Sequence, residues 1–266
     1  MKYEIKIISL IDILGFRNII SETTDGKGND SEEDIENTYH IFSTIRKSLG
    51  LDNPKCYFEK SKVITQFSDS IVISFLYSEE SGIFHNLFNI QLLIMELLKY
   101  KILCRGAVTL GKIIHTNDML FGPGFIKAYD TESKAALFPR VILDETILTI
   151  GKQFHSSHHA PEHELNSINS IISKDTDDMY YIDYFGKALE NLDSAEDEPL
   201  YIENLRKIIS PYINTDKPDL KVKYGWLINK FNRMINEIKG KRSSKDFFES
   251  DYDLGQYYKQ LSLIEN

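Results

Sequence analysis

Apolar residues in the first 145 positions recur in two distinct patterns. Dense or alternating runs rich in Ile, Val and Phe are typical of strands, and longer segments with apolar residues every three or four positions are typical of helices. Polar turn formers separate them, as in the loop 21–34. The pattern predicts strands at 4–13, 56–67, 69–77, 101–115 and 138–144, a short helix after the first strand, and helices at 32–50, 81–99 and 124–137.

Two of these helices carry further signals. Asp30 or Ser31 is expected to cap the helix 32–50, which Gly50 would end. The helix 81–99 has an apolar face that is expected to be its buried side, formed by Phe84, Phe88, Leu92, Met95 and Leu98.

The order of these elements predicts an α+β fold. Strand, helix, two strands joined by a hairpin at Ser68–Asp69, helix and strand form the ferredoxin-like split βαβ palm, with helices expected on one face of an antiparallel sheet. We expect this palm to occupy residues 1–145. Residues 146–266 are predicted to form a mostly helical extension, with one strand at 178–185 and an acidic loop at 191–199.

Charge and composition narrow the possible partners. The net charge of −9 argues against a nucleic acid as the main partner. Two cysteines without CxxC spacing, Cys56 and Cys104, fit a reducing compartment and are expected to be buried bystanders. The N-terminal run reads as a strand rather than a signal peptide, and no stretch is apolar enough to cross a membrane. We therefore expect a soluble, cytoplasmic protein.

Two carboxylates stand out against apolar surroundings. Asp12 ends the first strand, and Asp69 lies at the predicted hairpin between two strands. Because the first strand of a split βαβ palm lies beside this hairpin, both side chains should reach one edge of the sheet, where oxygen ligands suit Mg²⁺ or Mn²⁺. The alternative is that Asp69 is an ordinary turn residue and Asp12 caps the next helix. Their joint placement favours the metal interpretation.

These residues resemble the class III nucleotide cyclase catalytic domain over roughly residues 4–145. The motif Asp-Ile-Leu-Gly-Phe at 12–16 is similar to the family's motif after its first strand, and Asp69 stands at the family's second metal position. The segments "CRGAVTLG" (104–111) and "GPGFIKAYDTE" (122–132) look like the following strand and helix.

The chain departs from the purine cyclases at the positions that read the base. Thr65 and Met119 stand where that family has polar purine readers, and Ile126 and Asp130 stand where its helix supplies Asn and Arg. The sequence is more similar to the Pycsar-type pyrimidine cyclases of antiphage systems, through "IDILGF", "FSDSIVI", "RGAV" and "AYDTESKAALFPRV", with a late stretch from Lys223 to Leu227 and Asn232.

The resemblance implies how each site residue would act. Asp12 and Asp69, with the carbonyl of Ile13, would hold two Mg²⁺ or Mn²⁺ ions. The backbone N–H groups of a short loop would bind the phosphates, and the base would lie near Thr65 and Met119. The loop residues are Leu14, Gly15 and Phe16, with Arg17 able to add positive charge. The candidates for the missing transition-state cation are Arg105, Lys127 and Arg140.

The resemblance also implies an activity and partners. The expected reaction converts UTP or CTP to the cyclic monophosphate cUMP or cCMP and pyrophosphate, in a homodimer with composite sites. The product would activate a separate effector. The alternative is a degenerate cyclase fold that binds a nucleotide or partner without catalysis. The histidines of "HSSHHAPEH" (155–163) have spacings that suit zinc, but a solvated surface cluster is the favoured interpretation because Pro161 interrupts the helix.

Overall fold

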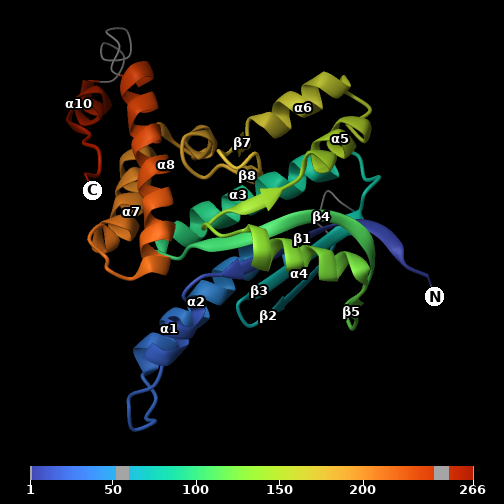
Figure 1. Ribbon diagram of the computed structural model, residues 1–266, viewed down its shortest axis with the longest axis horizontal. Helices are drawn as coiled ribbons and strands as arrows, with labels where there is room; N and C mark the ends of the chain where they lie inside the picture. Colours follow the sequence, from blue (N-terminus) through green and yellow to red (C-terminus); the bar gives the residue numbers. More distant parts are fainter. Residues whose placement is uncertain (1, 52–59, 243–251, 266) are drawn as a thin grey trace. The chain divides into compact units, whose positions relative to one another are not determined.

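The computed structural model describes residues 2–51, 60–242 and 252–265 (Figure 1). The chain divides into two compact units, Met1–Ile182 and Asp183–Asn266. We expected the first region to end at residue 145, but this unit continues to Ile182 because later strands extend its sheet. Cys56 and most of the first half of the predicted strand 56–67 lie outside the described residues.

The first unit contains the predicted split βαβ palm, so the α+β fold class is confirmed. Its four strands lie in the order β2-β3-β1-β4, and every neighbouring pair among them is antiparallel. The crossovers are helical. The elements are β1 (Glu4–Ile13), α1 (Phe16–Glu22), α2 (Glu32–Ser48), β2 (Val63–Phe67), β3 (Ser70–Leu76), α3 (Gly82–Lys99) and β4 (Cys104–His115).

Helices cover both faces of this sheet, whereas we expected them on one face. Successive side chains of a strand point to opposite faces, and the two faces of β1 meet different helices. On one face, Asn86 of α3 donates a hydrogen bond to Ser9 Oγ at 2.9 Å. On the other, Ile8 and Leu10 form a core cluster with Ala128 of α4 (Pro123–Ala135). The prediction was wrong because α4, which follows β4 and β5 in the chain, packs on the face of the sheet opposite to α3.

Two glycines let α4 approach the sheet closely. A Cβ on Gly111 of β4 would lie 2.4 Å from the Cα of Gly124, and one on Gly124 would lie 2.6 Å from Ile8 Cδ1. Any larger side chain at either position would force the helix away from β4 and β1. This contact lies at the end of β4 opposite to Arg105 and brings the first turn of α4 close to the sheet.

The buried face of α3 is wider than its sequence pattern predicts. Met95 and Leu98 are buried as expected, but Phe84, Phe88 and Leu92 are only half-buried. The prediction was partly wrong because α3 packs against further helices, α2, α5 and α6, as well as the sheet. The additional buried positions include Ile83, Leu87, Ile90, Ile94 and Leu97.

Three short strands extend the sheet beyond β4. Strand β6 (Val141–Leu143) pairs in parallel with β4, and β8 (Tyr180–Ile182) and β7 (Ile172–Lys174) follow in antiparallel pairs. The β7 strand was not predicted, since three residues give little pattern. The helices α5 (Glu145–Gln153) and α6 (Pro161–Asn169) connect β6 to β7.

The second unit is mostly helical, as expected. It contains α7 (Glu198–Ile209), α8 (Pro218–Arg242) and α10 (Tyr252–Gln260). Tyr258 of α10 is fully buried and its hydroxyl donates a hydrogen bond to Glu198 of α7. Among the described residues, no helix has both the length and the apolar composition needed to span a membrane.

Arg140 is a buried cation that joins two parts of the extended sheet. It precedes β6, is 0% exposed, and forms ion pairs with Asp175 and Asp177 in the turn between β7 and β8. Because charged groups lose their hydration on burial, these partners are needed to keep the guanidinium in place.

We expect Arg140→Met to lower the free energy of unfolding by about 3–5 kcal/mol, because it leaves Asp175 buried without its cation. Urea unfolding followed by circular dichroism measures this. The control is Lys134→Met, which removes the cation of an exposed pair with Asp130 and should cost less than about 0.5 kcal/mol. Equal effects of the two substitutions would show that the buried pairs are not needed.

Candidate functional site

The structure places Asp12 and Asp69 side by side at one edge of the sheet. Asp12 is the last but one residue of β1 and lies in register with Ser70, the first residue of β3. The Ile13 N–H donates a hydrogen bond of 2.9 Å to the carbonyl oxygen of Asp69, so the hairpin turn is tied directly to the end of β1. Ser68 in this turn has a φ of 54°, which makes the chain reverse tightly before Asp69.

Arg105 lies between Asp12 and a third carboxylate, Glu132. Arg105 is the register partner of Asp12 on β4, and its Nε lies 3.4 Å from Asp12 Oδ2 and 2.6 Å from Glu132 Oε1. Glu132 belongs to α4 and is almost fully buried at 4% exposure. Sequence reasoning did not single out Glu132; the only available signal was a carboxylate one helical turn after Ala128, on the buried face of α4.

The electrostatics of this group are those of two carboxylates that share one cation. Burial raises the pKa of Asp12; Arg105 lowers it and the Asp69 charge raises it again, with a net upward shift. Burial likewise raises the pKa of Glu132, against the lowering effect of Arg105. The nearby thiol is not a nucleophile, because burial and the Asp12 charge raise the pKa of Cys104 to about 12.

In the loop after β1, only some of the backbone N–H groups predicted to bind phosphate are available for it. The Leu14 N–H donates a hydrogen bond of 2.8 Å to Leu103 O, so it is not available to a phosphate. Gly15 has a φ of 81°, and a Cβ added to it would meet nothing within 4 Å. Its open, left-handed backbone leaves the N–H groups of Gly15 and Phe16 as the candidates for phosphate contact. Arg17 follows in α1.

Two of the three candidate cations lie away from Asp12. Arg140 is occupied by its buried ion pairs with Asp175 and Asp177, which indicates a structural role. Lys127 Nζ is 3.9 Å from Asp144, the residue directly after β6. The pairing of β4 with β6 places Asp144 about four residues, or about 13 Å, along the strand direction from Arg105. Arg105 is the candidate that the structure brings to the carboxylates.

A buried histidine, His115, connects Thr65 to the hairpin that carries Met119, and these are the two predicted base-contacting residues. His115 at the end of β4 hydrogen-bonds Thr65 Oγ1 at 2.9 Å and Ser74 Oγ at 2.8 Å. It also pairs in register with Leu120, the residue after Met119. The end of β4 curves over the sheet and turns into β5 (Leu120–Phe121), as Figure 1 shows. Met119 is exposed at this turn.

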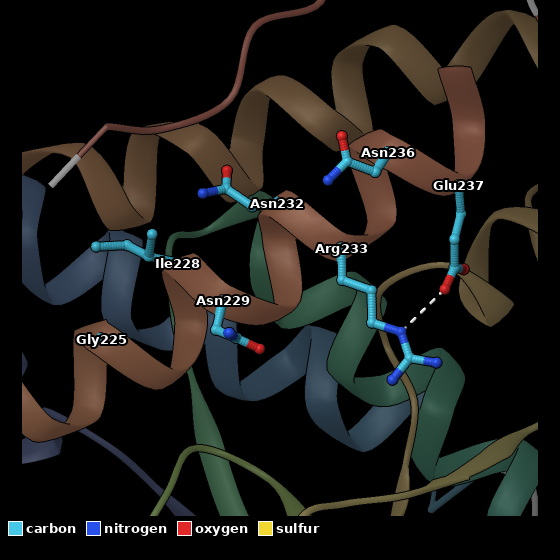
Figure 2. A pocket seen from close by; sticks show the side chains of 7 residues that line it. All are labelled: Gly225, Ile228, Asn229, Asn232, Arg233, Asn236 and Glu237. Carbon is cyan, nitrogen blue, oxygen red and sulfur yellow. Dashed lines mark hydrogen bonds and ion pairs between the residues drawn. The ribbon is translucent and has the colours of Figure 1, made fainter. Parts of the chain in front are cut away.

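The second unit has a groove on one side of α8, which is lined by polar side chains together with Gly225 and Ile228. Figure 2 shows the side chains of Asn229, Asn232 and Asn236 along this helix. Arg233 Nε donates a hydrogen bond of 3.0 Å to Glu237 Oε1. The groove has a volume of about 650 Å³. Asn232, which the sequence singled out, accepts a hydrogen bond from Ile264 N and donates one to Ile264 O, so it holds the C-terminal segment against α8.

Comparisons with known proteins give only distant similarities. No protein-family model and no curated protein matches the chain. Two structures of a bacterial light-regulated adenylyl cyclase are 13% and 15% identical, with TM-scores of 0.38 and 0.39; each match covers 56% of this chain and 45% of the other. The adenylyl cyclase CyaB from P. aeruginosa is 11% identical, with a TM-score of 0.41, over 68% of this chain and 95% of the other. The chain thus spans less than half of the light-regulated cyclase chains that it matches. The fold assignment rests on the strand order described above.

His115 should make stability depend on pH. Burial, with the nearby Lys6 charge, lowers the pKa of His115 from 6.5 to about 4. Between pH 6.5 and about pH 4, His115 is therefore protonated in the unfolded chain but neutral in the folded chain, so the free energy of unfolding falls as the pH is lowered through this range. His115 should account for up to about 3 kcal/mol of the decrease in the free energy of unfolding between these two pH values. We expect this decrease to be absent in His115→Gln, as measured by urea unfolding. The exposed His158→Gln is the control. Parallel pH profiles for wild type and His115→Gln would contradict the assignment.

Proposed function

We propose that this protein is a metal-dependent nucleotide cyclase that converts a pyrimidine nucleoside triphosphate, UTP or CTP, to its 3′,5′-cyclic monophosphate and pyrophosphate. The observation that carries the proposal is the placement of Asp12 and Asp69 at one edge of the sheet. The turn that bears Asp69 is hydrogen-bonded to the end of β1. The resemblance of residues 12–16 and 69 to the class III cyclase motifs supports the same reaction.

The donor groups at this edge suit Mg²⁺ or Mn²⁺. Burial is the largest cause of the raised pKa of Asp12, and repulsion by the Asp69 charge raises that pKa further, so a divalent cation would relieve the repulsion between the two carboxylates. Among the described residues, no group of three or more His, Cys, Asp or Glu side chains could hold a metal ion. Two carboxylates are nevertheless typical of an ion that also binds substrate phosphates. When bound, two ions held by Asp12, Asp69 and the Ile13 carbonyl would acidify the ribose 3′-OH and neutralise phosphate charge.

The chain's own residues would orient the nucleotide. The N–H groups of Gly15 and Phe16 would donate to its terminal phosphates, with Arg17 nearby. Arg105 would stabilise the negative charge that develops as the 3′-oxygen bonds to the α-phosphorus and the bond to the leaving pyrophosphate breaks. The proton of the 3′-OH passes to solvent. Glu132 would hold Arg105 in position through its ion pair.

The preference for a pyrimidine is supported by the residues near the predicted base site. Thr65 is short and its hydroxyl is engaged by His115, and Met119 is apolar. Neither side chain offers the charge or amide pairing that distinguishes purine edges. UTP and CTP differ at one exocyclic group, so a single hydrogen bond could separate them.

A second copy of the chain would complete the site. The β4–β5 hairpin, the outer surface of α4 and the segment that follows it expose five large apolar side chains, which is consistent with burial in a homodimer. They are Met119, Phe121, Ile126, Tyr129 and Leu137. In this proposal the cyclic nucleotide is an antiphage signal read by a separate effector protein, as in the Pycsar systems that the sequence resembles.

The second candidate function is nucleotide binding without catalysis. The specific observation in its favour is on α4, where Ile126 is exposed and Asp130 pairs with Lys134 in place of the Asn and Arg of the purine cyclases. Binding of a non-hydrolysable triphosphate without any cyclic product would support this candidate.

The product spectrum tests the proposal directly. We expect cUMP or cCMP when the full chain is incubated with each of the four nucleoside triphosphates and Mn²⁺ and the products are identified by mass spectrometry. cAMP or cGMP as the sole product would contradict the pyrimidine assignment.

Asp69→Asn tests the metal interpretation. We expect at least a roughly 100-fold loss of turnover with an unchanged fold, because the amide keeps the size and turn-forming ability of the side chain but not its charge. The control is Asp178→Asn, which changes another turn aspartate in a different part of the sheet and should leave turnover unchanged. Full activity of Asp69→Asn at saturating Mn²⁺ would reject a metal-binding role for this carboxylate.

Glu132→Gln tests how Arg105 is shared. Without the Glu132 charge, Arg105 should pair more strongly with Asp12 and compete with a cation there, so Mn²⁺ binding measured by electron paramagnetic resonance should weaken about tenfold. The control is Asp130→Asn on the exposed side of the same helix. Unchanged or tighter Mn²⁺ binding by Glu132→Gln would show that Glu132 does not draw Arg105 away from Asp12.

A further inference from the structure

A second cavity in the first unit lies outside the site described above. It has a volume of about 410 Å³, within the range of small-molecule pockets, and is formed by the start of α3, the loop after α5, and α6. None of the side chains proposed to bind the nucleotide lines it. The histidine-rich segment that the sequence analysis set aside contributes part of its wall.

Glu164 is a buried carboxylate in this pocket with one oxygen unsatisfied. The residue is 3% exposed, and its Oε2 accepts a hydrogen bond of 2.8 Å from Ser81 Oγ. Its Oε1 is buried and has no hydrogen-bond partner. Burial of a polar atom without a partner costs free energy comparable to a lost hydrogen bond, and more for a charged group. A ligand that donates a hydrogen bond to Oε1 would remove this cost.

The other walls favour a positive ligand. The described residues that line the pocket include a second carboxylate, Glu80, and no lysine or arginine. Phe84 also lines it, and the rings of His159 and His163 are stacked with their centroids 4.6 Å apart. The face of a phenylalanine ring attracts cations, and two carboxylates repel phosphates and other anions.

We propose that this pocket binds a small organic cation with N–H donors, an amine or a guanidinium compound, whose charged group donates to Glu164 Oε1. A metal ion fits less well, because no group of three or more ligating side chains among the described residues is arranged to hold one. Two of the clustered histidines, His159 and His163, line this pocket together with Phe84.

Titration of the full chain with agmatine tests the proposal, because this probe carries both an ammonium and a guanidinium group. Isothermal titration calorimetry should give saturable binding at one site. Glu164→Gln should bind roughly tenfold or more weakly, since the amide keeps the Ser81 hydrogen bond but loses the charge. The matched control is Glu162→Gln on the same helix, which pairs with Lys152 and does not line the pocket, and it should bind as wild type does.

His163→Ala gives a second readout, and its thermal melting, compared with wild type, separates loss of binding from loss of fold. We expect weaker agmatine binding with a retained melting transition. Four outcomes would overturn the proposal. They are no saturable binding by wild type, equal loss in Glu162→Gln and Glu164→Gln, displacement of agmatine by inorganic phosphate, and tighter binding of zinc ions that displace agmatine. Turnover of nucleotides does not enter the measurement, so this test is independent of the cyclase assay.

Discussion

The pairing of β1 with β3 on one side and β4 on the other is the constraint on which the candidate site depends. A strand held on both edges cannot slip by one residue without turning its buried Ile8 and Leu10 toward the wrong helix. The register therefore determines which face Asp12 shares with α4. It also places Asp12 opposite Arg105 and next to the turn that carries Asp69.

The arrangement of charges at this edge follows from that register and from the close approach of α4. Gly111 and Gly124 bring the helix near the sheet, and Glu132 then reaches Arg105 from above. A single guanidinium lies between two carboxylates whose pKa values are both raised by burial. The single positive charge of Arg105 does not neutralise this group, since Asp69 adds a further negative charge beside Asp12. This excess of negative charge is the local property on which the proposal of a divalent cation rests.

The elements beyond the palm have a different part in the first unit. The ion pairs of Arg140 with Asp175 and Asp177 connect the β7–β8 turn to the start of β6. The added strands are therefore stabilised by these ion pairs as well as by a few backbone hydrogen bonds between short strands. The helices α5 and α6 that connect β6 to β7 pack on α3. The start of α3, the loop after α5, and α6 form the pocket around Glu164. A palm that ended at residue 145 would have neither this cluster nor this pocket.

The sequence alone determined the palm and its two aspartates, and the tertiary structure decided how the other groups are used. Dense apolar runs at 4–13 and 69–77 and the turn at Ser68 are local signals, so the strands and the placement of Asp12 and Asp69 could be predicted. Arg105, Lys127 and Arg140 could not be ranked from sequence, because their partners lie 17 or more residues away in the chain and only folding brings them together. Glu132 and Glu164 were missed for the same reason: a carboxylate on a helix has no distinguishing pattern until its neighbours bury it.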